Sequence, residues 1–220
     1  MKKYLLSLSL LLASLASANA KSDFYAGIDI QRQDLQLETT PFTLNDGSNY
    51  KPSVSKFYET KSYNPNLFLG YNAHKNLDIE LGYSMSKENK KNNSTGLTSE
   101  DSFGDIYNLT TKSTLETKNI SLDLKPSYQI DQNNSLYGIL GLTYMQIKLR
   151  ESFYDYEIFT ENYKKNVLAP SVGVGYKLKI NDDFSFRSQF KYSYLNKEIG
   201  DSDVKIKSST QLSVGVAYNF

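Results

Sequence analysis

The sequence predicts an all-β fold: an eight-stranded antiparallel up-and-down transmembrane β-barrel. Apolar residues alternate with small or polar residues in eight runs, as expected of strands with one apolar face. The connections between the runs alternate between long and short, which is typical of membrane barrels with turns at one end and loops at the other. The last run stays apolar to the final residue, so it needs a partner strand, and barrel closure supplies one.

A secretory signal peptide is predicted at residues 1–20. Two lysines precede an apolar run at 5–15, and Ala18-Asn19-Ala20 is a small-residue cleavage site. The barrel domain is then expected to cover residues 21–220. The chain has 25 basic and 24 acidic residues, so it is close to neutral and carries no basic field for nucleic acid.

The first half of the barrel contains four of the runs. The third run is the clearest, because Leu77, Ile79 and Leu81 alternate with acidic residues directly after a short turn. The fourth contains Pro126, which has no N–H to donate to a neighbouring strand and should therefore lie near the strand end. These runs are expected at 24–37, up to 71, at 77–85 and at 120–128, with a short turn at 72–76 and polar loops at 38–56 and 87–116.

The second half of the barrel contains the other four runs. The fifth, at 136–149, is apolar or glycine on both faces, so the sequence leaves its outward face open. Its Gly138 and Gly141 indicate close packing inside the barrel. The remaining runs are expected at 167–180, 184–194 and 210–220, with short turns at 131–134 and 181–183 and polar loops at 150–166 and 195–208.

A family resemblance rests on three features of the sequence. They are the eight runs, the hairpin between GYNAHKN and LDIELGY, and the C-terminal VGVAYNF. The mature chain resembles the small OmpA/OmpX-type, opacity-like surface-antigen barrels of the Gram-negative outer membrane. The resemblance implies that Tyr218 and Phe220 form a signal read by the barrel assembly machinery, with periplasmic chaperones as further partners. It also implies an integral outer-membrane protein among lipid and lipopolysaccharide, with both termini in the periplasm.

The barrel interior is expected to be closed, because side chains just fill an eight-stranded barrel. Charged residues alternate with the apolar positions of several runs and should therefore point inward. We expect them to form a structural ion-pair network, and a gated ion path is the alternative. The predicted network contains Asp29, Asp78, Glu80, Asp123, Lys125, Lys177, Lys179, Arg187 and Lys191.

Catalytic and metal chemistry have little support in the sequence. The chain has one histidine, His74, and no cysteine. Lipid A deacylases and palmitoyltransferases, which use small outer-membrane barrels, hold a catalytic histidine on the outer-leaflet side. His74 lies in a short turn, which should face the periplasm, and is interpreted as a solvated turn residue. We therefore expect neither an enzyme nor a cofactor.

The loop at 150–166 is the strongest candidate for a contact surface. Aromatic residues alternate there with acids, as on surfaces that bind proteins. The alternative is that two strands extend beyond the membrane as a hairpin. The expected function is a structural or adhesion role at the surface, toward a host or cell-surface ligand; a narrow pore is the alternative, and a lipid A-modifying enzyme is less favoured. The aromatic residues are Phe153, Tyr154, Tyr156, Phe159 and Tyr163.

Overall fold

The structure of the protein is a computed structural model, which describes residues 23–39, 42–43, 49–50, 58–86, 89–100, 106–154, 158–199 and 204–220. The predicted signal peptide, residues 1–20, lies outside these described residues. Within them, no helix is long and apolar enough to cross a membrane.

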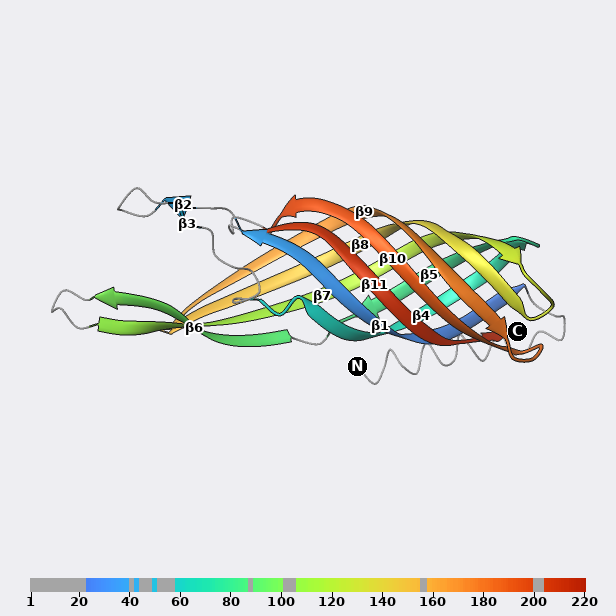
Figure 1. The fold of residues 1–220 in the computed structure, drawn as a ribbon, viewed down its shortest axis with the longest axis horizontal. Helices are drawn as coiled ribbons and strands as arrows, with labels where there is room; N and C mark the ends of the chain where they lie inside the picture. The colour runs from blue at the N-terminus through green and yellow to red at the C-terminus, as the bar shows by residue number, and fades with distance from the viewer. Residues whose placement is uncertain are drawn as a thin grey trace.

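Eight long strands form the wall of a closed barrel (Figure 1). They are β1 (Phe24–Thr39), β4 (Lys61–His74), β5 (Leu77–Met85), β7 (Ile106–Gln129), β8 (Asn134–Tyr154), β9 (Ile158–Lys179), β10 (Phe184–Glu198) and β11 (Val204–Asn219). The order around the wall is β5-β4-β1-β11-β10-β9-β8-β7, and antiparallel pairing of β5 with β7 closes the ring. The predicted eight-stranded antiparallel barrel is confirmed.

The two ends of the barrel differ. The turns at 75–76, 130–133 and 180–183 lie at one end, together with the start of β1 and the finish of β11; we call this the turn end. The opposite end, the loop end, carries the longer connections. There β7, β8 and β9 continue beyond the rest of the wall (Figure 1). The pairing of β9 with β10 stops at Ser171, whereas its pairing with β8 continues to Ile158.

All four stretches predicted as polar loops contain strand residues. In 195–208 these are the ends of β10 and β11, and two other stretches contain additional strands. The stretch at 87–116 includes β6 (Asn89–Glu100), which pairs with the outer part of β7. The stretch at 38–56 includes the short pair β2 (Phe42–Thr43) and β3 (Asn49–Tyr50). Such strands lack the alternation used for prediction, because a hairpin beyond the membrane does not need an apolar face.

The loop predicted at 150–166 is also mostly strand. The β8–β9 ladder runs to the pair Tyr154 and Ile158, so the hairpin alternative is the one the structure adopts. Only residues 155–157 separate the two strands.

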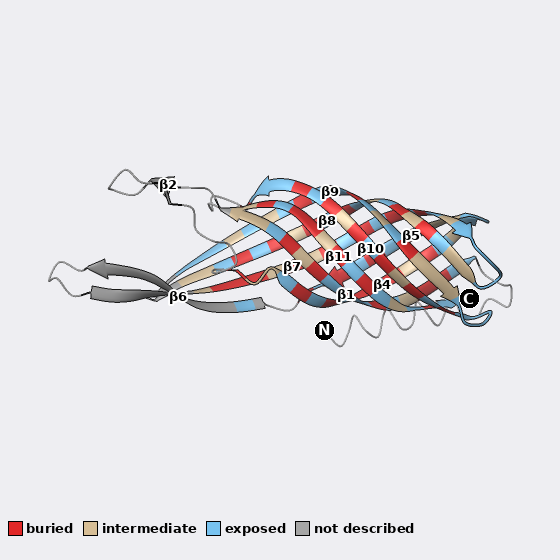
Figure 2. Cartoon of the chain, in the orientation of Figure 1, coloured by how far each residue is buried: buried red, intermediate tan, exposed pale blue. Residues whose placement is uncertain are grey.

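Buried and exposed residues alternate along the strands of the wall (Figure 2). The exposed ones are largely apolar, and many of the buried ones are polar. On β7, the exposed fraction is 53% for Leu122 and 2% for its neighbour Asp123. This inverts the arrangement of a soluble protein and is the arrangement of a barrel in lipid. The outward apolar residues, here called the apolar belt, include Ile28, Ile30, Leu67, Leu81, Ile120, Leu122, Leu140, Leu142, Tyr144, Leu168, Val172, Val174, Leu212, Val214 and Val216.

The structure decides the outward face of β8, which the sequence left open. Leu140 and Leu142 belong to the belt, while Ile139 is buried inside. A Cβ at Gly141 would collide with Asp123 Oδ1, so this glycine makes room inside the barrel as predicted. The prediction for Gly138 was wrong: it lies on the outward face, where its Cβ would meet the ring of Pro126.

Candidate functional site

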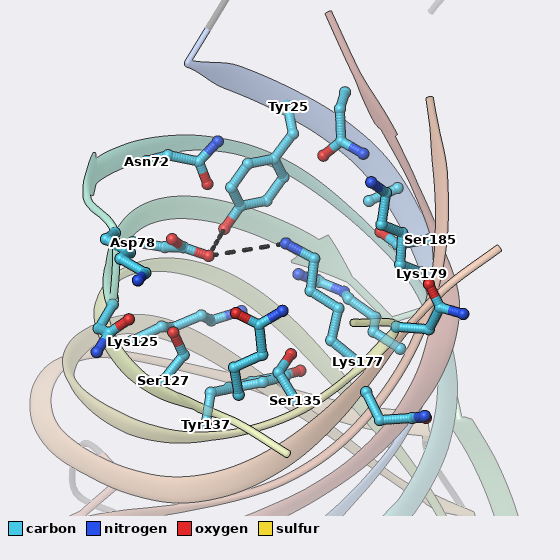
Figure 3. Close-up of a pocket in the computed structure, with 18 of the residues that line it drawn as sticks. Tyr25, Asn72, Asp78, Lys125, Ser127, Ser135, Tyr137, Lys177, Lys179 and Ser185 are labelled. Carbon is cyan, nitrogen blue, oxygen red and sulfur yellow. Dashed lines mark hydrogen bonds and ion pairs between the residues drawn. The ribbon is translucent and has the colours of Figure 1, made fainter. Parts of the chain in front are cut away.

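The interior of the barrel is the candidate site, and its first layer is a cavity open at the turn end. The cavity has a volume of about 770 Å³ and a mixed lining of charged, amide and aromatic groups (Figure 3). Lys177 Nζ lies 4.0 Å from Asp78 Oδ2 and 5.1 Å from the ring centre of Tyr25. The hydroxyl of Tyr25 donates to Glu80 at 3.1 Å, deeper in the barrel.

A buried ion cluster forms the floor of this cavity. Arg187 donates from Nε and Nη2 to the two oxygens of Asp29, at 2.8 and 2.6 Å, and from Nη1 to Glu80 at 2.5 Å. Lys125 donates to the other oxygen of Glu80 at 2.6 Å. All four side chains are at most 5% exposed. Two cations thus neutralise two carboxylates, and each carboxylate oxygen accepts a charge-assisted hydrogen bond.

A second ion pair lies farther along the interior. Lys191 Nζ is 3.0 Å from Asp123 Oδ2, and both side chains are buried. Ser121 also donates to Asp123, at 3.2 Å. The pair is linked to the loop end by an amide layer rather than by further charges.

The amide layer centres on Gln33, which is fully buried. Its Oε1 accepts from Thr117, Asn64 and Asn119 at 3.0 to 3.2 Å, and its Nε2 donates to Ser209 at 3.0 Å. These residues were not among those predicted from the sequence. Alternation in the first run could have found them, because Gln33 lies on the opposite face of β1 from the outward residues Ile28 and Ile30.

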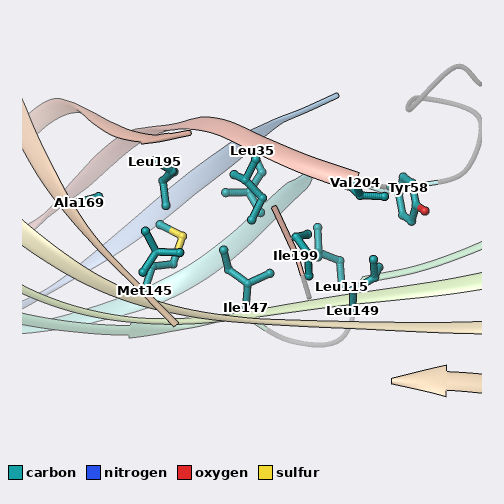
Figure 4. Close-up of a cluster of buried hydrophobic side chains, with 12 residues drawn as sticks. Leu35, Tyr58, Leu115, Met145, Ile147, Leu149, Ala169, Leu195, Ile199 and Val204 are labelled. Carbon is teal, nitrogen blue, oxygen red and sulfur yellow. The ribbon is translucent and has the colours of Figure 1, made fainter. Parts of the chain in front are cut away.

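The interior becomes apolar at the loop end (Figure 4). On β8, the inward side chains change from Thr143 to Met145, Ile147 and Leu149. This apolar plug explains the ambiguous fifth run: its outward face is apolar as far as Tyr144, and its inward face is apolar at Met145, Ile147 and Leu149. The plug consists of Leu35, Tyr58, Leu115, Met145, Ile147, Leu149, Val167, Ala169, Leu195, Ile199, Val204 and Ile206.

Eight of the nine predicted charged residues therefore divide into three groups. Asp29, Glu80, Lys125 and Arg187 meet in one cluster, and Asp123 meets Lys191 separately. Asp78 and Lys177 lie in the cavity at a long 4.0 Å separation. The structure does not bring Lys179 into the network: it lines the cavity mouth and binds the exposed turn residue Asp182 at 2.6 Å.

The other predicted site residues have diverse positions. His74 is exposed at the end of β4, and the described residues contain no group of three or more His, Cys, Asp or Glu side chains that could hold a metal ion. Phe220 donates its N–H to the carbonyl of Phe24 at 3.1 Å, and its ring lies 5.3 Å from that of Tyr218. The hydrogen bond joins the end of the chain to the first strand at the turn end.

Only one aromatic residue of the predicted contact surface has a described side chain. Tyr163 is half-buried, packs against the apolar plug and donates to Glu161. Tyr156 lies outside the described residues, as do the side chains of the remaining three, whose backbone belongs to β8 and β9; these are Phe153, Tyr154 and Phe159.

Comparison with known proteins establishes the class. Residues 4–220 match the family described as outer membrane protein beta-barrel domain, and the chain belongs to that family. It is an integral outer-membrane β-barrel. No curated protein matches the chain.

Three solved structures share the fold. Neisserial surface protein A (NspA) has 16% sequence identity and a TM-score of 0.54, covering 90% of this chain and 98% of its own. OprG from Pseudomonas aeruginosa has 13% identity and a TM-score of 0.56, covering 90% and 96%. A major outer membrane protein from Thermus thermophilus has 12% identity and a TM-score of 0.53, covering 89% and 99%. At these identities the likeness is one of fold.

Proposed function

We propose that the protein is a non-conducting surface barrel whose loop end faces the outside and carries a structural or adhesive role. The observation that carries this proposal is the apolar plug directly beneath the extended β7–β8–β9 sheet. A wall anchored in lipid and closed inside is suited to hold a rigid sheet above the membrane. The membrane-anchored barrel is common to the family. The surface role of the extended β7–β8–β9 sheet is our proposal for this chain.

The proposed orientation places both termini and the short turns in the periplasm. Its support is the asymmetry of the connections, since outer-membrane barrels have short periplasmic turns and longer external loops. Cleavage of a signal peptide at residue 20 belongs to the same proposal, as do periplasmic chaperones and the barrel assembly machinery as partners. Protease added to intact cells should cut near Tyr156 and not near Asp182. Cleavage near Asp182 before the cells are permeabilised would contradict the orientation.

The layered interior argues against a pore. An ion that enters the turn-end cavity meets the Arg187 cluster, then the amide layer, then the largely apolar side chains of the plug. Purified protein in planar bilayers should therefore give no steady single-channel events. Stable conductance by the wild-type chain would favour the narrow-pore alternative instead.

A non-enzymatic role is supported by the position of His74. It lies exposed at the turn end, away from the loop end where an outer-leaflet substrate would be presented under this orientation. Expression of the protein should therefore leave the mass of lipid A unchanged. A shift equal to the loss or gain of one acyl chain would identify a lipid A-modifying enzyme.

The β8–β9 hairpin is the proposed contact element. Cross-strand hydrogen bonds from Arg150 to Asn162 and between Ser152 and Thr160 order its outer part. We expect a variant with residues 151–161 replaced by a two-residue turn to lose attachment to host cells or neighbouring bacteria. A variant trimmed by the same length in the β6–β7 hairpin is the matched control. Attachment equal to wild type in the first variant would contradict the assignment.

A further inference from the structure

Three polar groups that line the turn-end cavity lack close partners among the described residues. In that part of the chain, the carboxyl of Asp78 contacts the hydroxyl of Tyr25 at 3.5 Å and Lys177 Nζ at 4.0 Å, so both of its contacts are long. Lys177 shares the long contact with Asp78 and lies 5.1 Å from the ring centre of Tyr25. Ser185 is 1% exposed, and its hydroxyl has no hydrogen-bond partner within the described ranges. Because buried polar groups are normally satisfied, these three side chains are available to a ligand.

The three groups are arranged across the cavity. Asp78 is on β5, and Ser185 is on β10, which is four strands away in either direction around the ring. Lys177 is on β9, next to β10, and its ammonium group reaches across the cavity toward Asp78 (Figure 3). Lys179 lies directly opposite Ser185 in the register of β9 and β10. The cavity therefore has a hydrogen-bond acceptor on one wall and donors on the opposite wall.

The charges around the cavity select the class of ligand. The ion cluster of the floor is neutral, and Lys179 is paired with Asp182. The charges of Asp78 and Lys177 cancel each other, so a ligand that carries only a negative charge would meet Asp78, and one that carries only a positive charge would meet Lys177. A molecule with an ammonium group at one end and a carboxylate at the other satisfies both walls. The other charged residues of the lining lie at the exposed rim, where water and salt screen them; they are Asp23, Lys75, Asp131 and Asp183.

The size and lining of the cavity favour a short peptide over a single amino acid. Its volume of about 770 Å³ falls within the range of roughly 300–1,000 Å³ for small-molecule sites, which enclose most of their ligand. Between the two charged walls lie the rings of Tyr25 and Tyr137 and the hydroxyls of Ser127 and Ser135 (Figure 3). Aromatic faces and hydroxyls can pack against and hydrogen-bond to a peptide backbone.

We propose that the turn-end cavity binds a short peptide whose two ends are free, with its ammonium group at Asp78 and its carboxylate at Lys177 and Ser185. This binding site goes beyond the proposed surface role of the loop end. Under the proposed orientation the cavity opens to the periplasm, and the peptide would come from that compartment. Binding by the purified protein does not depend on the orientation, which the protease experiment on intact cells tests separately.

The test uses calorimetric titration of the purified protein in detergent micelles with trialanine. Two further probes are blocked at one end: N-acetyl-trialanine has no ammonium group, and trialanine amide has no carboxylate. The wild-type protein should bind trialanine at least about tenfold more tightly than either blocked form, because each block removes a charge-assisted hydrogen bond. Free alanine should bind more weakly than trialanine, because it fills less of the cavity.

Two variants assign the ends of the peptide to the walls. Asp78→Asn should bind trialanine and N-acetyl-trialanine about equally and should still discriminate against trialanine amide. Lys177→Gln/Ser185→Ala should show the converse, with trialanine and its amide about equal. The matched control is Lys207→Gln, whose charge lies at the loop end and which should retain both wild-type preferences within about twofold. Heat-modifiability on gels checks that each variant is folded.

Several outcomes would overturn the proposal. The wild-type measurements decide it without any variant: absence of trialanine binding, or equal affinity for trialanine and both blocked forms, would exclude a site for the two free ends. Free alanine binding as tightly as trialanine would exclude the peptide as the selected ligand. Folded Asp78→Asn that kept the wild-type preference for a free ammonium group would contradict the role of this carboxyl.

Discussion

Arg187 and Asp29 are joined across a strand that separates them. Arg187 lies on β10 and Asp29 on β1, and both are in register with Gly215 of the intervening β11. Their two hydrogen bonds, at 2.8 and 2.6 Å, pass over a residue that has no side chain. A Cβ at Gly215 would collide with Asp29 Oδ1. The glycine is therefore part of the ion cluster's geometry.

Substitution of Arg187 by alanine should be strongly destabilising. It would leave Asp29 without its bidentate partner in a buried site, and losing one member of a buried ion pair typically costs about 3–5 kcal/mol. Lys207→Ala removes an ion pair whose side chains are 51% and 37% exposed, and it should cost at most about 1 kcal/mol. Urea unfolding in micelles measures the loss of stability in both variants. Similar small effects would mean that water reaches the Arg187 cluster.

Gly215→Ala should lower stability through the same cluster. The added methyl would collide with the carbonyl oxygen of Ile28 as well as with Asp29, so both the ladder and the ion pair must shift. Gly138→Ala is the matched control, because its Cβ would meet its nearest atom at an ordinary 3.5 Å. We expect a cost of about 1–3 kcal/mol for the first substitution, as for overpacking in general, and little for the second. If Gly215→Ala left the stability unchanged, Gly215 would not lie as close to Ile28 and Asp29 as the structure shows.

Ile147→Ala should destabilise the apolar plug by about 2–5 kcal/mol, because Ile147 is fully buried and its removal leaves a cavity. Ile30 provides the comparison, since it is 66% exposed on the belt. Ile30→Ala removes the same atoms, but lipid or detergent fills the space. In thermal or urea unfolding, the Ile147→Ala variant should therefore be much less stable than the Ile30→Ala variant. The reverse order would indicate that the plug is loosely packed.

Phe220→Ala should impair assembly in the outer membrane. From the family resemblance we expect the terminal strand to be the recognition element for assembly, and Phe220 packs with Tyr218 where the last strand meets the first. The variant is expected to accumulate in the periplasm and to be degraded. Heat-modifiability on gels and membrane fractionation measure the folded pool. Wild-type amounts of folded, membrane-embedded variant would contradict this role.

The turn residue Asp131 should show an acid-sensitive contribution to stability. Hydrogen bonds from the backbone N–H of Asn133 and from Asn134 hold the pKa of this carboxyl below its usual value. The contribution is therefore present above the unfolded-state pKa and disappears as the pH falls through the lower folded-state pKa. A pH titration of the carboxyl signal by NMR in the folded protein should give the lowered value. Asp131→Ala should abolish the local pH dependence of the turn's amide signals.

The sequence by itself determined which strands make the wall. For most of these strands it also determined which side chains point outward to the lipid and which point into the barrel. Alternation over runs such as 77–85 is a local property of the chain, and the belt requires it because every second residue touches lipid. It also placed Asp29, Glu80, Lys125 and Arg187 on the inward parity. Where apolar residues occupy both faces, as over much of 136–149, or polar residues dominate the sequence, as at 87–116, alternation gives no contrast between the two faces.

The tertiary structure alone decided which inward charges meet. Arg187 is 158 residues from Asp29 in the chain, and their contact depends on the order of strands around the ring and on the glycine between them. Lys179 has the same parity as Lys177 but lies nearer the mouth, where it binds Asp182. The apolar plug at the loop end likewise arises from register between neighbouring strands. Register is set by pairing across the sheet, so no single strand's sequence contains it.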